Sequence, residues 1–460
     1  MVDGGSLENC CTAMYRGFES LFLRKSPTQR MGLFLHLISA LRKDTYMKKH
    51  ILAILALVVA VCSCSKSNSD NDQRYQFSER VPIVLSKSQQ EIVNQGNSFA
   101  FDFFRELCKL EKDKEVFISP FSLQAAFCML CNGAKGDTYT QIVDAMGFQG
   151  MSKEEVNNTY KILTNALLNA DSSTKLSIAN ALWANLSFPI LPAFSATLSN
   201  DYGARVENLD FSSQKALSAI NSWTNDSTNG MIPTLFDRLD PSWAYILTNA
   251  IYFKGIWSEK FKTENTYKED FHCLSGDKRS TDFMHGEIPC YYNESENLHA
   301  ALCELPFGNK SFLLDILLPD ESLDFDTFVA KFGARQWEEM TGELWKSNQY
   351  VVIPKMDVSY TGTDSFKASL KALGIEDVFG GNADLTGVSE VPTYISDVIQ
   401  KAKFKMDENG AEAAAVTGLI AKETSIGLSP EFVADHPFIY AIREYSTGAI
   451  LFMGACKNLL

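Results

Sequence analysis

The stretch 407–432, DENGAEAAAVTGLIAKETSIGLSPEF, decides how the rest of the chain is interpreted. It follows KAKFKM (401–406), a strictly alternating strand pattern with lysines on one face and apolar side chains on the other. The stretch itself has little to bury, although loops longer than about 12–15 residues are uncommon in compact domains and are usually functional or disordered. It therefore indicates a functional loop with a hinge at Gly410, because glycine adopts backbone angles that other residues avoid.

The first half of this loop carries small side chains that would alternate between two faces of an extended backbone. Such side chains displace little volume, so the segment could slide between two packed strands. Alanine does not favour strands, and a helix or flexible loop is the alternative. The strand interpretation also needs a bulge near Gly410, because the alternation changes register there. One face would carry Ala411, Ala413, Ala415 and Thr417, and the other would carry Glu412, Ala414 and Val416.

Helical and strand patterns interleave through residues 75–460 without a Pro-, Gly- or Ser-rich linker, so we expect one large domain. Ser119 and Pro120 predict the start of a helix of about twelve residues. The segment 245–257 is almost continuously apolar, as in a strand covered on both faces. The segment 436–455 predicts two core strands joined as a hairpin.

We expect an export signal to begin at Met47. A short basic start precedes the apolar run 51–61, which is too short for a membrane span of about 20 residues but suits a secretory signal. The run ends in VCSC, which resembles the lipobox of bacterial lipoproteins and makes Cys64 the expected lipidated residue. Cys62 fits less well because Val61 is bulky at the cleavage position. A plain signal peptide with incidental cysteines is the alternative.

The signal divides the chain into four expected parts. Residues 1–46 are an over-long start or a dispensable extension, 47–63 the signal peptide, 64–74 a flexible tether and 75–460 the folded domain. The expected location is a bacterial outer membrane, on its periplasmic or cell-surface face, with the extracellular space as an alternative. The membrane would be a partner only through the lipid anchor.

Charge and motifs exclude several classes of function. The net charge of −14, without a run of Lys or Arg, argues against binding of nucleic acid. The common hydrolase, zinc-protease and nucleotide-binding motifs are missing, and the four histidines beyond Cys64 lack metal-ligand spacing. We therefore expect no metal, no cofactor and no catalytic residues, although a triad assembled only in space stays open.

Seven cysteines follow Cys64, an odd number scattered among apolar neighbours. A disulfide framework uses an even, densely spaced set. Cys128 and Cys131 form a C-x-x-C, which can serve redox or zinc chemistry, but they lie in an apolar helical segment without a second pair. We therefore expect buried thiols.

Six segments, taken in order, resemble the signature segments of the serpin family from about residue 85 to 460. The resemblance implies an α+β fold with a large, mostly antiparallel central β-sheet, further β-sheets, about nine helices and an exposed reactive-centre loop at about 408–434. It also implies a monomeric inhibitor of serine proteases and not an enzyme. The segments are FISPFSLQAAFCMLCNGAKGDT (117–138), INSWTNDSTNGMI (220–232), LTNAIYFKGIW (247–257), VVIPKMDVSY (351–360), DENGAEAAAVTG (407–418) and DHPFIYAIREYSTGAILFMG (435–454).

The resemblance also implies roles for individual residues. Glu408 and Gly410 match the hinge, and the segment that inserts into the sheet after cleavage comprises Ala411, Glu412, Ala413, Ala414, Ala415 and Val416. Ser119, Ser122 and Asn249 match the "shutter" beneath the opening strands, and Trp257 matches the "breach" where insertion starts.

The family's loop numbering places the cleaved bond between Thr424 and Ser425, with bonds after Lys422 or Ile426 as alternatives. Three positions depart from the family pattern. Gln400 stands where a shutter histidine is common, Ala411 replaces the commoner Thr or Ser, and the chain lacks the usual Asn-Pro near its end. An amide at Gln400 can still form hydrogen bonds, though without charge.

A threonine before the cleaved bond suggests subtilisin-like or elastase-like serine proteases, or cysteine proteases of similar tolerance, as partners. Lys422 keeps trypsin-like proteases as an option. The main alternative is a non-inhibitory serpin-fold binding or scaffold protein, in which the hinge would more often carry bulky, charged or proline residues. A hydrolase on the same fold is the third hypothesis.

Overall fold

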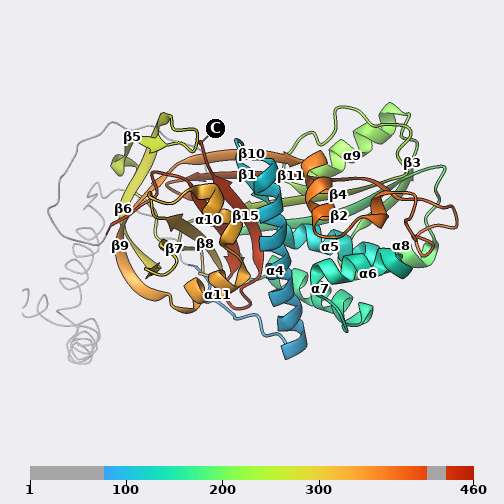
Figure 1. Cartoon of the computed structure of the whole chain (residues 1–460), viewed down its shortest axis with the longest axis horizontal. Coiled ribbons are helices and arrows are strands. Elements are labelled where there is room, and N and C mark those ends of the chain that lie inside the picture. The colour runs from blue at the N-terminus through green and yellow to red at the C-terminus, as the bar shows by residue number, and fades with distance from the viewer. Residues whose placement is uncertain (1–76, 412–430, 460) are drawn as a thin grey trace, which may run out of the picture. The chain divides into compact units, whose positions relative to one another are not determined.

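The computed structural model describes residues 77–411 and 431–459 (Figure 1). The expected extension, signal peptide and tether, with Cys64, lie outside these residues. None of the described helices is long and apolar enough to span a membrane. The described residues form nine α-helices: α4 (Lys87–Leu110), α5 (Pro120–Cys131), α6 (Gly136–Met146), α7 (Lys153–Leu168), α8 (Pro192–Tyr202), α9 (Gln214–Ser227), α10 (Phe325–Lys331), α11 (Ala334–Gly342) and α12 (Asp364–Ala372).

A six-stranded sheet contains the strand that leads into the loop. Three of its five pairings are antiparallel, whereas β11 with β4 and β2 with β3 are parallel. All of β4 except Lys254 is buried, as predicted for a strand covered on both faces, but β4 ends at Lys254 instead of continuing to residue 257. The order is β10 (Met356–Gly362), β11 (Ile395–Asp407), β4 (Tyr245–Lys254), β2 (Lys175–Asn185) and β3 (Arg205–Leu209), with β12 (Gly410–Ala411) beside β11.

A nine-stranded sheet contains the predicted C-terminal hairpin, β14 with β15. Its pairings are antiparallel except β9 with β13, which are parallel at the edge. The order is β1 (Val116–Ile118), β15 (Ile450–Cys456), β14 (Phe438–Glu444), β8 (Phe312–Pro319), β7 (Ala300–Phe307), β6 (Lys278–Ser295), β9 (Trp345–Pro354) and β13 (Glu431–Val433), with β5 (Thr266–His272) paired to β6.

Helices cover both faces of the six-stranded sheet. Leu247 of β4 packs into the main core, which also contains most of α5. Its neighbour Ile246 points to the opposite face and packs in a second cluster with Ala216 and Ile220 of α9. Because successive side chains of a strand point to opposite faces, both layers hold β4 in place. Because both faces are covered, a new strand can join this sheet only in the plane of the sheet, between two neighbouring strands.

The start of α5 follows from its local sequence. Ser119 is extended, and its Oγ accepts a hydrogen bond from the backbone N–H of Ser122 at 3.3 Å. Pro120 occupies the first turn, where its missing N–H costs no helical hydrogen bond. Both features confirm the predicted helix start. They also place Ser119 in the core, directly below the six-stranded sheet.

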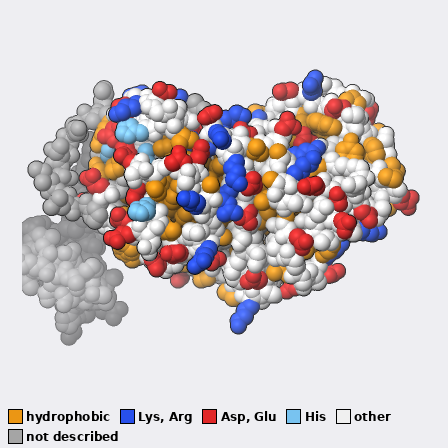
Figure 2. All heavy atoms as spheres, in the orientation of Figure 1, with side chains coloured by type: hydrophobic (Ala, Val, Ile, Leu, Met, Phe, Trp, Pro, Cys, Tyr) orange, Lys and Arg blue, Asp and Glu red, His pale blue; other side chains and the backbone are white. Residues whose placement is uncertain are grey.

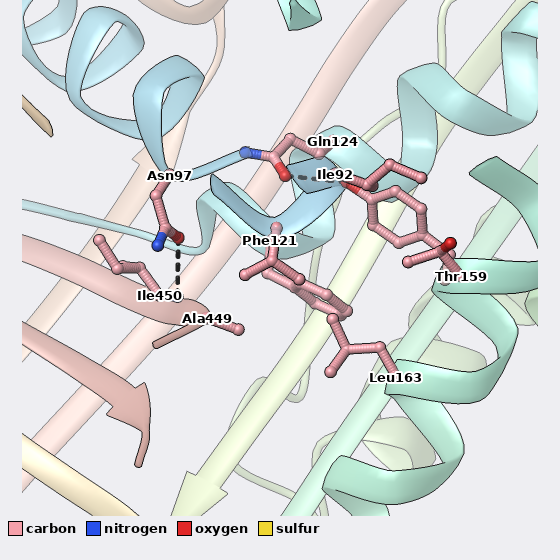
Figure 3. Close-up of a pocket in the computed structure, with 10 residues that line it drawn as sticks. Ile92, Asn97, Phe121, Gln124, Thr159, Leu163, Ala449 and Ile450 are labelled. Carbon is pink, nitrogen blue, oxygen red and sulfur yellow. Dashed lines mark hydrogen bonds between the residues drawn. The ribbon is translucent and has the colours of Figure 1, made fainter. Parts of the chain in front are cut away.

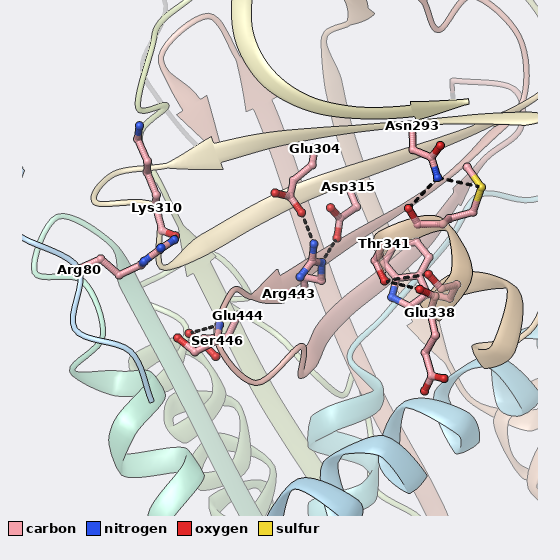
Figure 4. Close-up of polar contacts among 12 residues, drawn as sticks. Arg80, Asn293, Glu304, Lys310, Asp315, Glu338, Thr341, Arg443, Glu444 and Ser446 are labelled. Carbon is pink, nitrogen blue, oxygen red and sulfur yellow. Dashed lines mark hydrogen bonds and ion pairs between the residues drawn. The ribbon is translucent and has the colours of Figure 1, made fainter. Parts of the chain in front are cut away.

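A buried group of three ionisable residues crosses the nine-stranded sheet (Figure 4). Arg443 on β14 donates from Nε to Oδ2 of Asp315 on β8 at 2.7 Å, and from Nη2 to Glu304 on β7. Burial and the neighbouring charge of Asp315 raise the pKa of Glu304 to about 8, against the opposing effect of Arg443. One arginine therefore faces two carboxyl groups, and Glu304 retains a proton at neutral pH.

Candidate functional site

The six-stranded sheet is open at one end, between β11 and β4. These strands pair from Ile395 with Tyr245 as far as Lys401 with Ala250, and their pairing stops there. Beyond Lys401, β11 keeps β10 on one side and has β12 on the other. The sheet thus presents a gap beside the strand that leads into the loop.

Gly410 lies in this gap and is bridged on both sides. On one side it pairs with Asp407 of β11, and on the other with Ile256, two residues beyond the end of β4. The chain reaches this position through a turn at Glu408 and Asn409, so β12 runs antiparallel to β11. The turn, and not the expected bulge, accounts for the change of register between β11 and Ala411. The first residues of the loop therefore already occupy the place of an inserted strand.

The backbone conformation and the space at position 410 accept only glycine. Its φ is +140°, a region that residues with a Cβ rarely adopt. A Cβ at this position would also lie 2.1 Å from the carbonyl oxygen of Gly255, which is backbone and cannot rotate away. The next residue, Ala411, is 1% exposed, so a small side chain is needed there as well.

Trp257, three residues beyond the end of β4, holds the turn from the other side of the gap. Its backbone N–H donates to the carbonyl of Asn409 at 2.9 Å, and its Nε1 donates to the carbonyl of Asp407 at 2.8 Å. The indole stacks on Phe307, with 4.5 Å between ring centroids, and the N–H of Phe261 donates to the carbonyl of Glu408 at 3.2 Å. The predicted breach tryptophan therefore contacts the predicted hinge directly.

Glu408 and Lys355 form an ion pair at the same place. Lys355 Nζ lies 3.0 Å from Oε2 and 3.2 Å from Oε1 of a nearly buried Glu408 side chain. Burial alone would raise the pKa of Glu408, but hydrogen bonds and the charge of Lys355 outweigh it and lower the pKa below its ordinary value. The carboxylate of Glu408 is therefore ionised at neutral pH and paired with Lys355.

The predicted shutter residues meet just below the gap. Gln400 of β11 accepts at Oε1 from the N–H of Ser119 at 2.7 Å, and its Nε2 donates to the carbonyl of Ser119 at 2.9 Å and to Oδ1 of Asn249 at 3.3 Å. Asn249 in turn donates to Oδ1 of Asn180 on β2 at 2.7 Å. This amide chain links β11, β4 and β2 where the pairing of β11 with β4 ends.

Ser119 and Ser122 differ in their part in this cluster. Ser119 Oγ donates to the carbonyl of Leu451 at 2.6 Å and so ties α5 to β15. Ser122 contributes its backbone N–H to Ser119, whereas its buried hydroxyl has no hydrogen-bond partner among the described residues. Its part is therefore packing within α5.

The rest of the predicted loop lies outside the described residues. These positions are Glu412, Ala413, Ala414, Ala415, Val416, Lys422, Thr424, Ser425 and Ile426. The chain resumes at β13, whose Phe432 pairs with Val351 of β9 at the edge of the nine-stranded sheet. The two described ends of the loop are therefore anchored in different sheets.

Three partners of this site had no signal in the sequence: Lys355, Asn180 and Phe307. Lys355 is the single residue between β9 and β10, and Asn180 and Phe307 lie within strands. Each reaches the site through pairing between distant segments, which spacing along the chain does not reveal.

The described cysteines are free thiols, as predicted, and all are buried except the half-buried Cys131. Burial raises the pKa of Cys131 to about 12 and that of Cys128 well above its ordinary value. Both therefore remain protonated, which disfavours redox or zinc use of this C-x-x-C because the thiolate is the reactive form.

A cavity between α4, α5, α7 and the start of β15 has a volume of only about 10 Å³ (Figure 3). Tyr160 Oη donates to Oε1 of Gln124 at 2.8 Å, and the N–H of Ile450 donates to Oδ1 of Asn97 at 3.1 Å. Such a volume suits one water molecule and is far too small for an organic ligand. This cavity is therefore not a ligand site.

Comparison with known proteins identifies relatives of this chain. A family model described as "Serpin (serine protease inhibitor)" matches residues 94–459. The leukocyte elastase inhibitor of Sus scrofa is 34% identical over 382 residues, which are 80% of this chain and all of that protein.

Two solved structures share the fold over most of the chain. Serpin48 of the insect Tenebrio molitor is 30% identical, with a TM-score of 0.72, and the match covers 82% of this chain and 100% of that one. Thyroxine-binding globulin in complex with thyroxine is 28% identical, with a TM-score of 0.74, and the match covers 80% and 99% of the two chains.

Proposed function

The chain belongs to the serpin family, and we propose that it is a suicide-substrate inhibitor of serine proteases. The protease attacks the loop 408–434 and forms an acyl-enzyme through its own nucleophile. Before the ester hydrolyses, the freed N-terminal part of the loop enters the six-stranded sheet beside β11 and carries the protease with it. Loop insertion in serpins is an established case of strand addition to a β-sheet.

The observation that carries this proposal is the double bridge at Gly410. The residue pairs with Asp407 on one side and Ile256 on the other, where β11 and β4 have separated. An inserting segment therefore has both edges available and its first residue in register. Ala411 and the small residues that follow it add little side-chain volume to the space between the strands.

The energy of insertion is sufficient for the trap. A new strand of about a dozen residues, paired on both edges, forms roughly 20 backbone hydrogen bonds, each with a net value of about 0.5–1.5 kcal/mol. The total, on the order of 10–30 kcal/mol, is comparable with or larger than the stability of a typical domain, about 5–15 kcal/mol. Insertion can therefore distort an attached protease enough to stop deacylation.

The proposed targets are elastase-like or subtilisin-like serine proteases, with cysteine proteases of similar preference as further partners. Thr424 before the proposed cleaved bond favours them, and elastase inhibitors are among the relatives. Trypsin-like proteases would instead cut after Lys422. We further propose that a lipid on Cys64 anchors the monomeric protein to a bacterial outer membrane, as the VCSC sequence suggests.

A non-inhibitory binding role is the second candidate, because the fold is shared with thyroxine-binding globulin. Incubation with elastase, subtilisin and trypsin, followed by a denaturing gel, separates the two. An inhibitor gives a complex that survives SDS and releases a peptide of 36 residues, 425–460, whose mass identifies the bond. Cleavage without any such complex, by all three proteases, would contradict the inhibitory function.

A further inference from the structure

Three side chains from distant segments gather beside the nine-stranded sheet. One nitrogen or oxygen atom from each of His272, Glu321 and Asp435 lies within 4.8 Å of the other two. His272 ends β5, Glu321 follows β8, and Asp435 precedes β14. Figure 2 shows histidine side chains among carboxylates toward one end of the visible face. Because the three residues are so far apart in sequence, no spacing motif predicts the cluster.

The backbone fixes two members of this cluster relative to each other. The N–H of His272 donates to the carbonyl of Asp435 at 2.7 Å. His436 Nδ1 lies 2.9 Å from Oδ1 of Asp435, and its Nε2 lies 2.8 Å from the carbonyl oxygen of Pro319, so both nitrogens donate when the imidazole is protonated. Since both ring nitrogens of His436 face acceptors, this residue orients Asp435 and is not a ligand, while Asp435 keeps its second oxygen for a cation.

We propose that His272, Glu321 and Asp435 bind a divalent transition-metal cation, with Zn²⁺ the best fit. One imidazole and two carboxylates form a nitrogen and oxygen donor set that zinc accepts, with water completing a tetrahedron. Mg²⁺ and Ca²⁺ prefer oxygen donors alone, so the imidazole disfavours them. The two carboxylates balance the charge of the cation. Glu321 is exposed and His272 and Asp435 are half-buried, so the cation can enter from solvent.

The cation would join the end of β5, the segment after β8 and the connection between β13 and β14. Asp435 lies in the short connection between β13 and β14, and β13 is the strand that follows the loop. A bound cation would therefore fasten the C-terminal end of β13 to β5 and to the end of β8. It would stabilise the folded protein, because the unfolded chain does not hold the three ligands together.

Thermal unfolding and calorimetric titration of the purified protein with ZnCl₂ test this site. We expect one site per chain and a melting temperature higher by roughly 3–5 °C when Zn²⁺ exceeds its Kd a hundredfold. MgCl₂ should leave the melting temperature unchanged. In Glu321→Gln and His272→Gln, the increase should be lost, and circular dichroism would verify that both variants fold.

His299→Asn is the matched control. His299 is exposed, pairs with Asp320 beside the cluster at 3.3 Å, and has a positive φ of 49° that asparagine tolerates. The control should respond to Zn²⁺ as the wild type does. An equal increase in Glu321→Gln and wild type, or no one-site binding by the wild type, would overturn the proposal.

Discussion

The ammonium of Lys355 lies 3.0 Å from the carboxylate of Glu408, and this pair connects the start of the loop to both sheets. Lys355 is the single residue between β9 of the nine-stranded sheet and β10 of the six-stranded sheet. Glu408 is the first residue after β11. The turn that places Gly410 in the gap is therefore fastened where the two sheets meet.

Replacing Lys355 with Met should destabilise the protein, because it leaves the nearly buried carboxylate of Glu408 without its cation. We expect a loss of about 1–3 kcal/mol in the free energy of unfolding, measured with urea. The double variant Lys355→Met/Glu408→Gln should recover part of this loss, since no buried charge is then left unpaired. Additive losses in the double variant would show that the ion pair contributes nothing.

Gly410→Ala should release the start of the loop from the gap. The added Cβ meets the carbonyl oxygen of Gly255, and alanine does not favour a φ of +140°. We expect faster hydrogen exchange at residues 407–411 and a higher rate of cleavage by elastase in the loop. Gly342→Ala is the control, because no atom lies within 4 Å of the added Cβ there. Unchanged hydrogen exchange at residues 407–411 in Gly410→Ala would contradict the position of Gly410 between Asp407 and Ile256.

Gln400→Leu should weaken the closure of the sheet below the gap. The substitution leaves the buried N–H of Ser119 and the amide oxygen of Asn249 without that partner, whereas the carbonyl of Ser119 still accepts from the N–H of Leu123. Lost hydrogen bonds of this kind cost about 1–3 kcal/mol each, so a total of roughly 2–4 kcal/mol is expected in urea unfolding. Gln400→His, which can still donate and accept, should lose less. Equal losses for Leu and His would indicate that packing, not hydrogen bonding, matters at this position.

Local patterns in the sequence predicted elements whose causes are themselves local. Ser119 and Pro120 start α5, and the continuous apolar run forms the doubly covered strand β4. Gly410 could also be singled out, because it stands between an alternating strand and a run of small residues, and its role as a hinge stays a prediction. The resemblance to serpins then supplied the large, mostly antiparallel sheet and the approximate number of helices, which periodicity alone does not give.

Long-range geometry could not be predicted in the same way. The turn at Glu408 and Asn409 depends on the indole of Trp257 and on Lys355, more than fifty residues away in sequence. Whether the loop starts inside the sheet depends on where the pairing of β11 with β4 stops, and the burial patterns of both strands continue past that point without marking it. The cluster of His272, Glu321 and Asp435 likewise arises only from the topology.

The stability of the protein should fall as pH rises from about 4.5 to about 8, because of Glu304. Its pKa is raised from 4.5 to about 8, so in this range the folded protein binds a proton that the unfolded chain releases. Glu304→Gln mimics the protonated carboxyl and should flatten the fall in melting temperature between pH 6 and pH 8. Glu296→Gln, at an exposed position in the turn between β6 and β7, is the control. A slope unchanged by Glu304→Gln would show that this carboxyl is already ionised at pH 6.

Ala413→Pro tests insertion itself. Proline lacks the N–H that an inserted strand donates to its neighbour, and its ring restricts the backbone, so it should slow insertion. About 1.4 kcal/mol added to the barrier slows insertion tenfold, while deacylation by the protease continues at its own rate. The variant should therefore be cleaved as a substrate, with many more molecules consumed per protease inhibited. Ala413→Ser keeps both the N–H and a small side chain and should inhibit like the wild type. If Ala413→Pro forms SDS-stable complexes in the wild-type yield, the protease is not trapped by entry of this segment into the six-stranded sheet.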